Sequence, residues 1–145
     1  MKNVVKIAGL LLAGFLFASP AVAAEHKLVL QISDNNPQKM NTVLNVAANV
    51  SRYYSGKGEE IDIRIVAFNQ GLHMLRTDTS PVKKRMMSFA GSMPNVEFDA
   101  CDNTRQAMMK KSGKDVPLFK FAKVVPAGVV TIIELSEAGY TVVRP

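Results

Sequence analysis

The fold is decided by residues 28–47, LVLQISDNNPQKMNTVLNVA, because this stretch joins a short strand to an amphipathic helix. Residues 28–32 form an apolar run typical of a buried strand. Asn36 and Pro37 then mark a helix start, with Asn36 as the N-cap and Pro37 at the first helical position. Apolar residues recur at helical spacing beyond it, so one face of this helix is expected to pack on a sheet. They are Met40, Val43, Leu44, Ala47 and Tyr54.

The alternation of strand and helix continues to the end of the chain and sets the fold class. Further strands are expected at 61–68, 96–100, 123–125 and 140–144, and further helices from Ser80 and Pro81, from Asn103 or Thr104 to Lys111, and from Val129 to a cap at Gly139. Residues 129–133 would also suit a strand by β-propensity, but their helical spacing favours the helix. This order predicts a three-layer α/β/α sandwich with a mostly parallel five-stranded sheet.

Composition limits the classes of function. The 145 residues suit one domain, and 48% apolar and 21% charged residues can form a core. One cysteine and two histidines exclude a disulfide framework and a typical zinc site, so no metal and no cofactor are expected. The chain has no tryptophan and its basic residues are scattered, although the net charge is +6. This pattern does not favour nucleic-acid binding.

The first residues are typical of a cleavable signal peptide. Lys2 and Lys6 precede an apolar stretch over residues 7–18, which is shorter than the roughly 20 residues that span a bilayer. Small residues at 21–24 then suit signal peptidase, with cleavage after Ala23 or Ala24. We therefore expect a signal peptide at 1–24, a domain at 25–145, a periplasmic location and no membrane attachment after cleavage. An uncleaved N-terminal anchor is the alternative.

Polar segments follow the ends of the predicted strands, where sites form in open α/β sheets. One of them contains Cys101, placed between a strand end and a helix start. Backbone N–H groups and the helix dipole at such a position stabilise a thiolate, whereas the neighbouring Asp99 and Asp102 oppose it. Cys101 is therefore the candidate nucleophile. A buried structural cysteine is the alternative, because free cysteine is among the most buried residue types.

Two further groups of residues are candidates at the same edge. His73 follows the neighbouring strand and is a candidate partner that would activate Cys101 as a thiolate–imidazolium pair, or else a packing residue. The second group consists of candidate substrate-binding residues, and its asparagines also suit cap and turn positions. These residues would bind a small anion by donating hydrogen bonds to it. They are Asn35, Asn69, Asn103, Thr104 and Gly128.

Five motifs in order resemble the exported single-domain branch of the DsrE/DsrF-like sulfur-relay family. They are SDNNP at 33–37, LNVAAN at 44–49, VAF at 66–68 with GL at 71–72, FDACDNT at 98–104 and VPAGV at 125–129. The resemblance implies a five-stranded sandwich that assembles as trimers or hexamers. It also implies that Cys101 carries sulfur as a persulfide and passes it to a partner protein. Residues 69–71, NQG, replace the glycine-proline-glycine-like turn of many relatives.

Two functions follow. The first is a sulfur carrier, or sulfurtransferase-like protein, that takes sulfur from small sulfur anions and gives it to a thiol-bearing acceptor protein, since the chain has no second cysteine to resolve the persulfide. The second is a non-enzymatic homo-oligomeric binding or assembly module with a structural cysteine. The apolar run at 124–135 favours a homo-oligomer. A thiol peroxidase or disulfide oxidoreductase is disfavoured because there is no C-x-x-C motif.

Overall fold

All five strands of the protein run parallel in one sheet, with the order β4-β3-β2-β1-β5. The computed structural model describes residues 26–145, so the expected signal peptide at 1–24 lies outside the described residues. The strands are β1 (His26–Ile32), β2 (Ile61–Ala67), β3 (Val96–Cys101), β4 (Ala122–Val125) and β5 (Thr141–Val143). The predicted five-stranded parallel sheet is confirmed.

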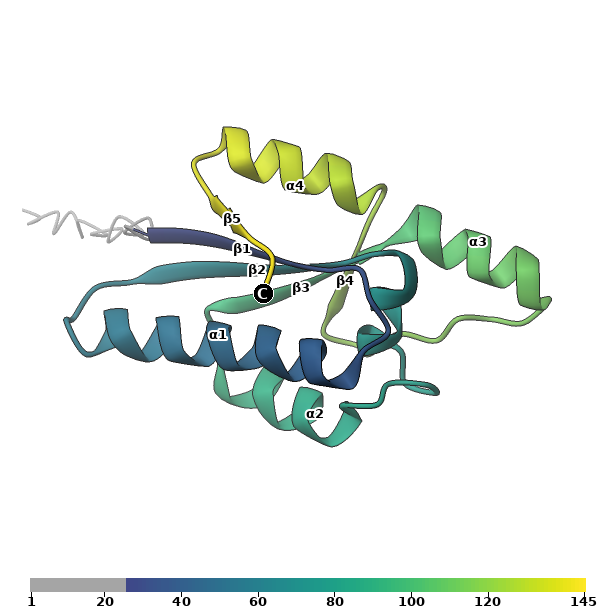
Figure 1. Ribbon diagram of the computed structural model, residues 1–145, viewed down its shortest axis with the longest axis horizontal. Coiled ribbons are helices and arrows are strands. Elements are labelled where there is room, and N and C mark those ends of the chain that lie inside the picture. Colours follow the sequence, from purple (N-terminus) through teal and green to yellow (C-terminus); the bar gives the residue numbers. More distant parts are fainter. Residues whose placement is uncertain (1–25) are drawn as a thin grey trace, which may run out of the picture.

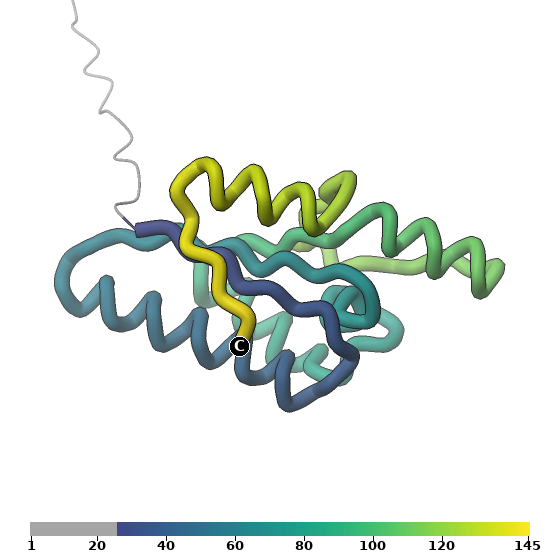
Figure 2. Tube along the Cα trace, turned by 45° about the horizontal axis from the view of Figure 1, so that its top comes forward, coloured from purple at the N-terminus to yellow at the C-terminus, as the bar shows by residue number. Residues whose placement is uncertain are grey.

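Helices cover both faces of the sheet, which makes the three layers (Figure 1). Helices α1 and α2 lie on one face, and α3 and α4 lie on the other, where α3 extends away from the sheet (Figures 1 and 2). Their bounds are α1 (Pro37–Ser55), α2 (Lys83–Ser92), α3 (Asp102–Ser112) and α4 (Gly128–Glu137), and a 3-10 helix, η1 (Asn69–Leu75), follows β2. Among residues 26–145, no helix is long and apolar enough to cross a membrane.

Helix α1 begins as its sequence predicts. The Asn36 side chain accepts hydrogen bonds from the backbone N–H groups of Gln38 (2.8 Å) and Lys39 (3.2 Å), and Pro37 is the first helical residue. The predicted apolar face is buried at Met40, Val43, Leu44 and Ala47, and Tyr54 packs at the margin of the core. Burial of this face against β1 and β2 fixes α1 on the sheet.

The two faces of the sheet differ in chemistry. The face under α1 and α2 is apolar, with buried side chains that include Leu30, Ile63 and Phe98. The opposite face carries Arg64 on β2 and Asp99 on β3. The Asp99 side chain is fully buried, and the Arg64 guanidinium donates to both carboxylate oxygens, at 3.0 Å from Nε and 2.7 Å from Nη2. A buried ion pair therefore holds the middle of the second face together.

Two helix starts differ from the predictions. Helix α3 starts at Asp102 with Cys101 as its N-cap, so capping by Asn103 or Thr104 was wrong. Helix α2 starts at Lys83, and not at Ser80 and Pro81, because residues 81–82 form a turn before it. The strand alternative for 129–133 is also excluded, because these residues lie in α4. The shifts have a local cause. Several neighbouring polar residues can serve as the N-cap about equally well, and the helix begins after the last residue that keeps an extended backbone.

Candidate functional site

Residues that follow three of the predicted strands meet at the carboxyl ends of β2, β3 and β4. The backbone N–H of Asn69 donates to Oγ1 of Thr104 at 3.0 Å, and the backbone N–H of Asn103 donates to the carbonyl of Pro126 at 3.2 Å. Gly128 lies directly against Cys101, because a β-carbon added to this glycine would be 3.3 Å from Cβ of Cys101. The strand ends thus bring together residues that are far apart in the sequence.

Cys101 is the last residue of β3 and the N-cap of α3. Its side chain is buried, with 5% of the residue exposed. A Ser, Thr, Asp or Asn at this position would normally accept hydrogen bonds from the second and third backbone N–H groups of the helix. Here those two groups belong to Thr104 and to Asn103, whose N–H also donates to the Pro126 carbonyl. The neutral thiol makes no capping hydrogen bond. The available donors therefore favour the ionised sulfur.

Opposing effects act on the Cys101 thiol. Burial is the largest and raises its pKa, because it disfavours the charged form. Hydrogen bonding from the Thr104 hydroxyl, and from the backbone N–H groups of Gly128, Thr104 and Asn103, lowers the pKa and outweighs burial. Cys101 therefore ionises more readily than an ordinary thiol. Of the three backbone donors, two lie at the start of α3 and one at the start of α4, so both helix N-termini face the sulfur.

The two aspartates beside Cys101 have partners of their own. Asp99 is paired with Arg64, and Asp102 lies 3.7 Å from Nη1 of Arg105 and accepts a hydrogen bond from Gln106. Neither is among the main causes of the pKa shift of Cys101. The sequence left the direction of this shift open, and the pairing of both carboxylates explains why the hydrogen-bond donors decide it.

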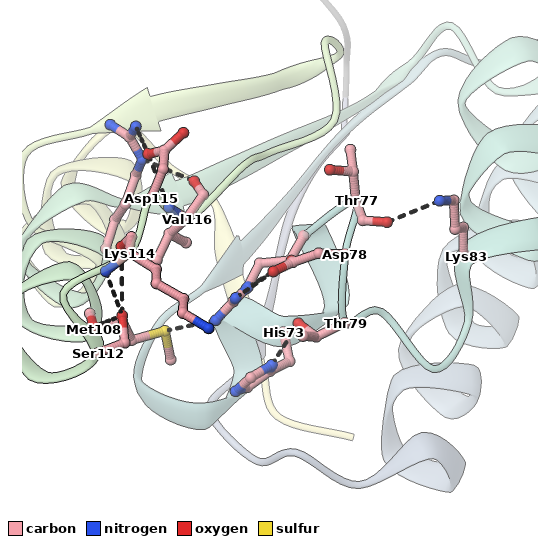
Figure 3. Close-up of polar contacts among 12 residues, drawn as sticks. His73, Thr77, Asp78, Thr79, Lys83, Met108, Ser112, Lys114, Asp115 and Val116 are labelled. Carbon is pink, nitrogen blue, oxygen red and sulfur yellow. Dashed lines mark hydrogen bonds and ion pairs between the residues drawn. The ribbon is translucent and has the colours of Figure 1, made fainter.

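His73 is held by another residue. Its Nδ1 lies 2.7 Å from Oγ1 of Thr79, and Figure 3 shows the ring beside Thr79. Desolvation and the charge of Arg76 lower the pKa of His73, which works against an imidazolium. No hydrogen bond or pKa effect within residues 26–145 joins His73 to Cys101. The predicted pair stays a prediction without support from these contacts.

The predicted anion-binding residues separate into two groups. Asn69, Asn103, Thr104 and Gly128 surround Cys101, but the contacts of both asparagines there are made by their backbone N–H groups. Asn35 is exposed in the loop after β1, and β2 stands between β1 and β3 in the sheet. Among the described residues, no hydrogen bond links Asn35 to the Cys101 segment.

Sequence reasoning missed Phe68 and the Arg64–Asp99 pair. Phe68 follows β2, and a β-carbon on Gly128 would be 3.1 Å from its Cβ, so this side chain forms a wall of the thiol site. In the sequence, the signal for this role of Phe68 was its position at the end of a predicted strand. Arg64 and Asp99 lie diagonally on adjacent strands with an offset of two residues, since Arg64 pairs with Glu97 and Val66 with Asp99. In the sequence, the available signal for this ion pair was the presence of opposite charges in two strands that were predicted to be neighbours.

Comparison with known proteins identifies the fold but no activity. No protein-family model matches the chain, and no curated protein matches it. A solved structure that is similar is that of a protein of unknown function, MTH1491 from Methanobacterium thermoautotrophicum. The two are 26% identical with a TM-score of 0.70, and the match covers 83% of this chain and 100% of the other. Both share an α/β fold with a five-stranded parallel sheet flanked by helices.

Proposed function

We propose that this protein is an exported, DsrE/DsrF-like sulfur carrier that holds sulfane sulfur as a persulfide on Cys101. The observation that carries the proposal is the set of donors around Cys101: the Thr104 hydroxyl and the first backbone N–H groups of α3 and α4. They favour the thiolate, which is the nucleophilic form of cysteine. The same donors suit a persulfide, because its outer sulfur is also anionic. The signal peptide at 1–24 would deliver the carrier to the periplasm.

The chemistry needs two exchanges at sulfur. In the first, the Cys101 thiolate attacks the outer sulfur of a donor such as thiosulfate, a new S–S bond forms, and the S–S bond of the donor breaks. Sulfite leaves with the electron pair of the broken bond. In the second, a thiolate of an acceptor protein attacks the outer sulfur of the persulfide, and Cys101 leaves as a thiolate. The acceptor must be another molecule, because the chain has one cysteine.

The test is mass spectrometry of the mature protein after incubation with thiosulfate or polysulfide. We expect the Cys101 peptide to gain the mass of one sulfur atom and to lose it on treatment with a reducing thiol. Cys101→Ser is the control and should gain nothing. If iodoacetamide labels Cys101 in the native protein but no donor adds sulfur, the carrier proposal is wrong.

A homo-oligomeric assembly module is the second candidate, and the surface of α4 favours it. Val129, Val130 and Ile133 are about half exposed, at 53%, 51% and 52%. At roughly 25 cal/mol per Å² of apolar surface, exposure of these side chains to water is costly, and burial between subunits removes this cost. A trimer or hexamer, as the resemblance implies, would bury them around a closed symmetry axis.

Light scattering of two matched variants tests this assembly. Ile133→Glu places a charge within the apolar surface of α4 and should dissociate the oligomer. Ala107→Glu adds the same charge at an exposed position on α3 and should leave the oligomer intact. A wild-type protein that is monomeric at every concentration would exclude the assembly. Native-state alkylation separates the two functions, because a purely structural Cys101 reacts only after denaturation.

A further inference from the structure

Cleavage of the proposed signal peptide would create a new amino terminus close to His26. Of the two cleavage positions, the bond after Ala23 fits the A-x-A pattern best, with Ala21 and Ala23 at the two small-residue positions. The mature chain then begins Ala24-Glu25-His26, with a histidine as its third residue. Export therefore gives the protein a group that its precursor lacks, a free α-amine two residues before an imidazole.

An amino terminus with histidine in third place is a chelate for divalent copper. The α-amine, the two following backbone amide nitrogens and Nδ1 of the imidazole can supply four nitrogens in one plane. A square-planar set of nitrogen donors is typical of Cu(II) and Ni(II), and Cu(II) is the more tightly bound of the two. Both amide nitrogens lose their protons to solvent when they bind the metal.

The imidazole of His26 is held in a way that suits this chelate. Its Nε2 lies 3.0 Å from Oε2 of Glu59, and its ring stacks on Tyr54 with the centroids 3.9 Å apart. Within residues 26–145, Nδ1 of His26 makes no hydrogen bond. A neutral imidazole that donates from Nε2 to a carboxylate carries its lone pair on Nδ1, which is the nitrogen that a terminal chelate uses. Such carboxylate–histidine pairs orient the ligand in metal sites.

The backbone nitrogen of His26 lies at the very start of the sheet. Its N–H donates to the carbonyl of Glu60 at 3.2 Å, beside the first register pair of β1 with β2, His26 with Ile61. Coordination of this nitrogen would remove that one terminal hydrogen bond, whose net value is small, and leave the later pairs intact. The His26 side chain is 35% exposed, so a metal ion can reach it from solution.

We propose that the mature amino terminus, Ala24-Glu25-His26, binds one Cu(II) ion through four nitrogens, with Glu59 orienting the imidazole from outside the coordination sphere. The proposal rests on the export that is part of the proposed function, and not on Cys101. Three of the four ligands belong to the main chain, so a count of histidine and cysteine side chains does not detect the site. The expectation of no metal followed from such a count.

The experiment uses the mature protein, recovered from the periplasm of a bacterial host that expresses the full chain. Cys101→Ser is present in every sample, so that no thiol reduces or binds the metal. The intact mass first identifies the amino-terminal residue, which should be Ala24. Titration with copper(II) chloride should then load one ion per chain, with the visible absorption and the nitrogen hyperfine splitting of a planar four-nitrogen complex. Nickel(II) chloride should give a diamagnetic complex at the same site.

Variants of the terminus and of its neighbours test the ligands. Glu25→Pro removes one amide proton and blocks one ligand while the histidine stays, so it should abolish the four-nitrogen spectrum, as should His26→Gln. His73→Gln is the matched control, because it removes the other histidine and should change nothing. Glu59→Gln should weaken Cu(II) binding about tenfold, whereas Glu60→Gln, at the exposed neighbouring position, should retain the wild-type affinity.

The outcomes decide the copper site separately from the sulfur carrier. A mature chain that begins at Glu25 has one nitrogen too few and overturns the proposal, as does any terminus other than Ala24. A four-nitrogen spectrum that persists in Glu25→Pro or His26→Gln overturns it as well. Equal affinities of Glu59→Gln and Glu60→Gln overturn the role of Glu59. Copper binding by a protein whose Cys101 takes up no sulfur retains the copper site and rejects the carrier, and the converse result does the reverse.

Discussion

Gly128 and Cys101 lie in contact across the carboxyl ends of the strands, and the fit leaves no space for a side chain at position 128. A β-carbon there would be 3.1 Å from Cβ of Phe68 and 3.3 Å from Cβ of Cys101. Contacts this tight force a neighbour to move. The glycine therefore allows the first turn of α4 to approach the sulfur closely, and its backbone N–H helps to lower the pKa of Cys101.

Substitution of Gly128 by alanine should therefore raise the pKa of Cys101 and lower stability. The added methyl group displaces the N-terminus of α4, which weakens hydrogen bonding to the thiolate and costs about 1–3 kcal/mol of unfolding free energy. Alkylation against pH and urea unfolding measure the two effects. Gly91→Ala is the matched control, because nothing lies within 4 Å of its added methyl group, and alanine within α2 should stabilise by about 0.5–1 kcal/mol. Equal behaviour of the two variants would contradict the prediction.

A second glycine is required by a backbone contact. A β-carbon on Gly71 would be 2.2 Å from the carbonyl oxygen of Ile32, at the end of β1. Because backbone atoms cannot rotate away, Gly71→Ala should cost about 2–4 kcal/mol and separate η1 from β1. Urea unfolding compared with Gly91→Ala checks this. A loss below about 0.5 kcal/mol would show that the two segments are not in tight contact.

Loss of one partner from the buried ion pair should be strongly destabilising. Asp99→Ala removes the fully buried partner of the Arg64 guanidinium and leaves it only the exposed Glu97 carboxylate, at 3.4 Å, so the variant should cost about 3 kcal/mol in urea unfolding. Asp115→Ala is the control, since this carboxylate is 70% exposed at 3.3 Å from Arg105, and its loss should cost less than about 1 kcal/mol.

The double variant Arg64→Met with Asp99→Leu separates the cost of an unpaired charge from the value of the pair. It should recover most of the stability lost in Asp99→Ala, because neither charge is then left buried alone. If the double variant is as unstable as the single one, packing at these positions, and not the unpaired charge, determines the loss.

Tyr140 should remain protonated in alkaline solution. Burial, and then a hydrogen bond donated to the Asp62 carboxylate, raises the pKa of Tyr140 to about 12. The folded pKa lies above the unfolded value of about 10, so the contribution to stability is complete below pH about 10 and is lost as the pH rises through about 12. Tyr140→Phe should therefore leave the tyrosinate absorbance change between about pH 9 and 11 nearly unaltered. A loss of one third of the signal, from a chain with three tyrosines, would contradict this.

Local patterns predicted the elements better than their contacts. Asn36, Pro37 and the spaced apolar residues specify α1 within a few positions, and the structure confirms that helix. The ambiguous run at 129–133 also forms the predicted helix, and its exposed Val129 and Ile133 match the excess of apolar residues in the sequence. These features depend on neighbours within about two helical turns, which is the range that periodicity reports.

The arrangement of the site depends on contacts between distant segments, which periodicity does not report. Cys101 was identified from its place between a strand and a helix. The contact of Asn69 with Thr104 joins residues 35 positions apart, and the packing of Gly128 on Phe68 joins the start of α4 to the end of β2, which share no sequence pattern. The role of backbone N–H groups was also hidden, because a residue's identity does not reveal where its main chain is directed.

Helix α3 has no buried residue, although the Cys101 side chain at its N-terminus is 95% shielded from solvent. A helix held by so little packing detaches at a smaller free-energy cost than unfolding of the sheet that it leaves. The sulfur is thus covered in part by a helix that packs on the core only through partly buried side chains, which include Met108 and Met109. We therefore expect reagents to reach the sulfur through local opening, in which α3 undocks while β1 to β4 stay paired, so that alkylation of Cys101 in the native protein should not require unfolding of the sheet.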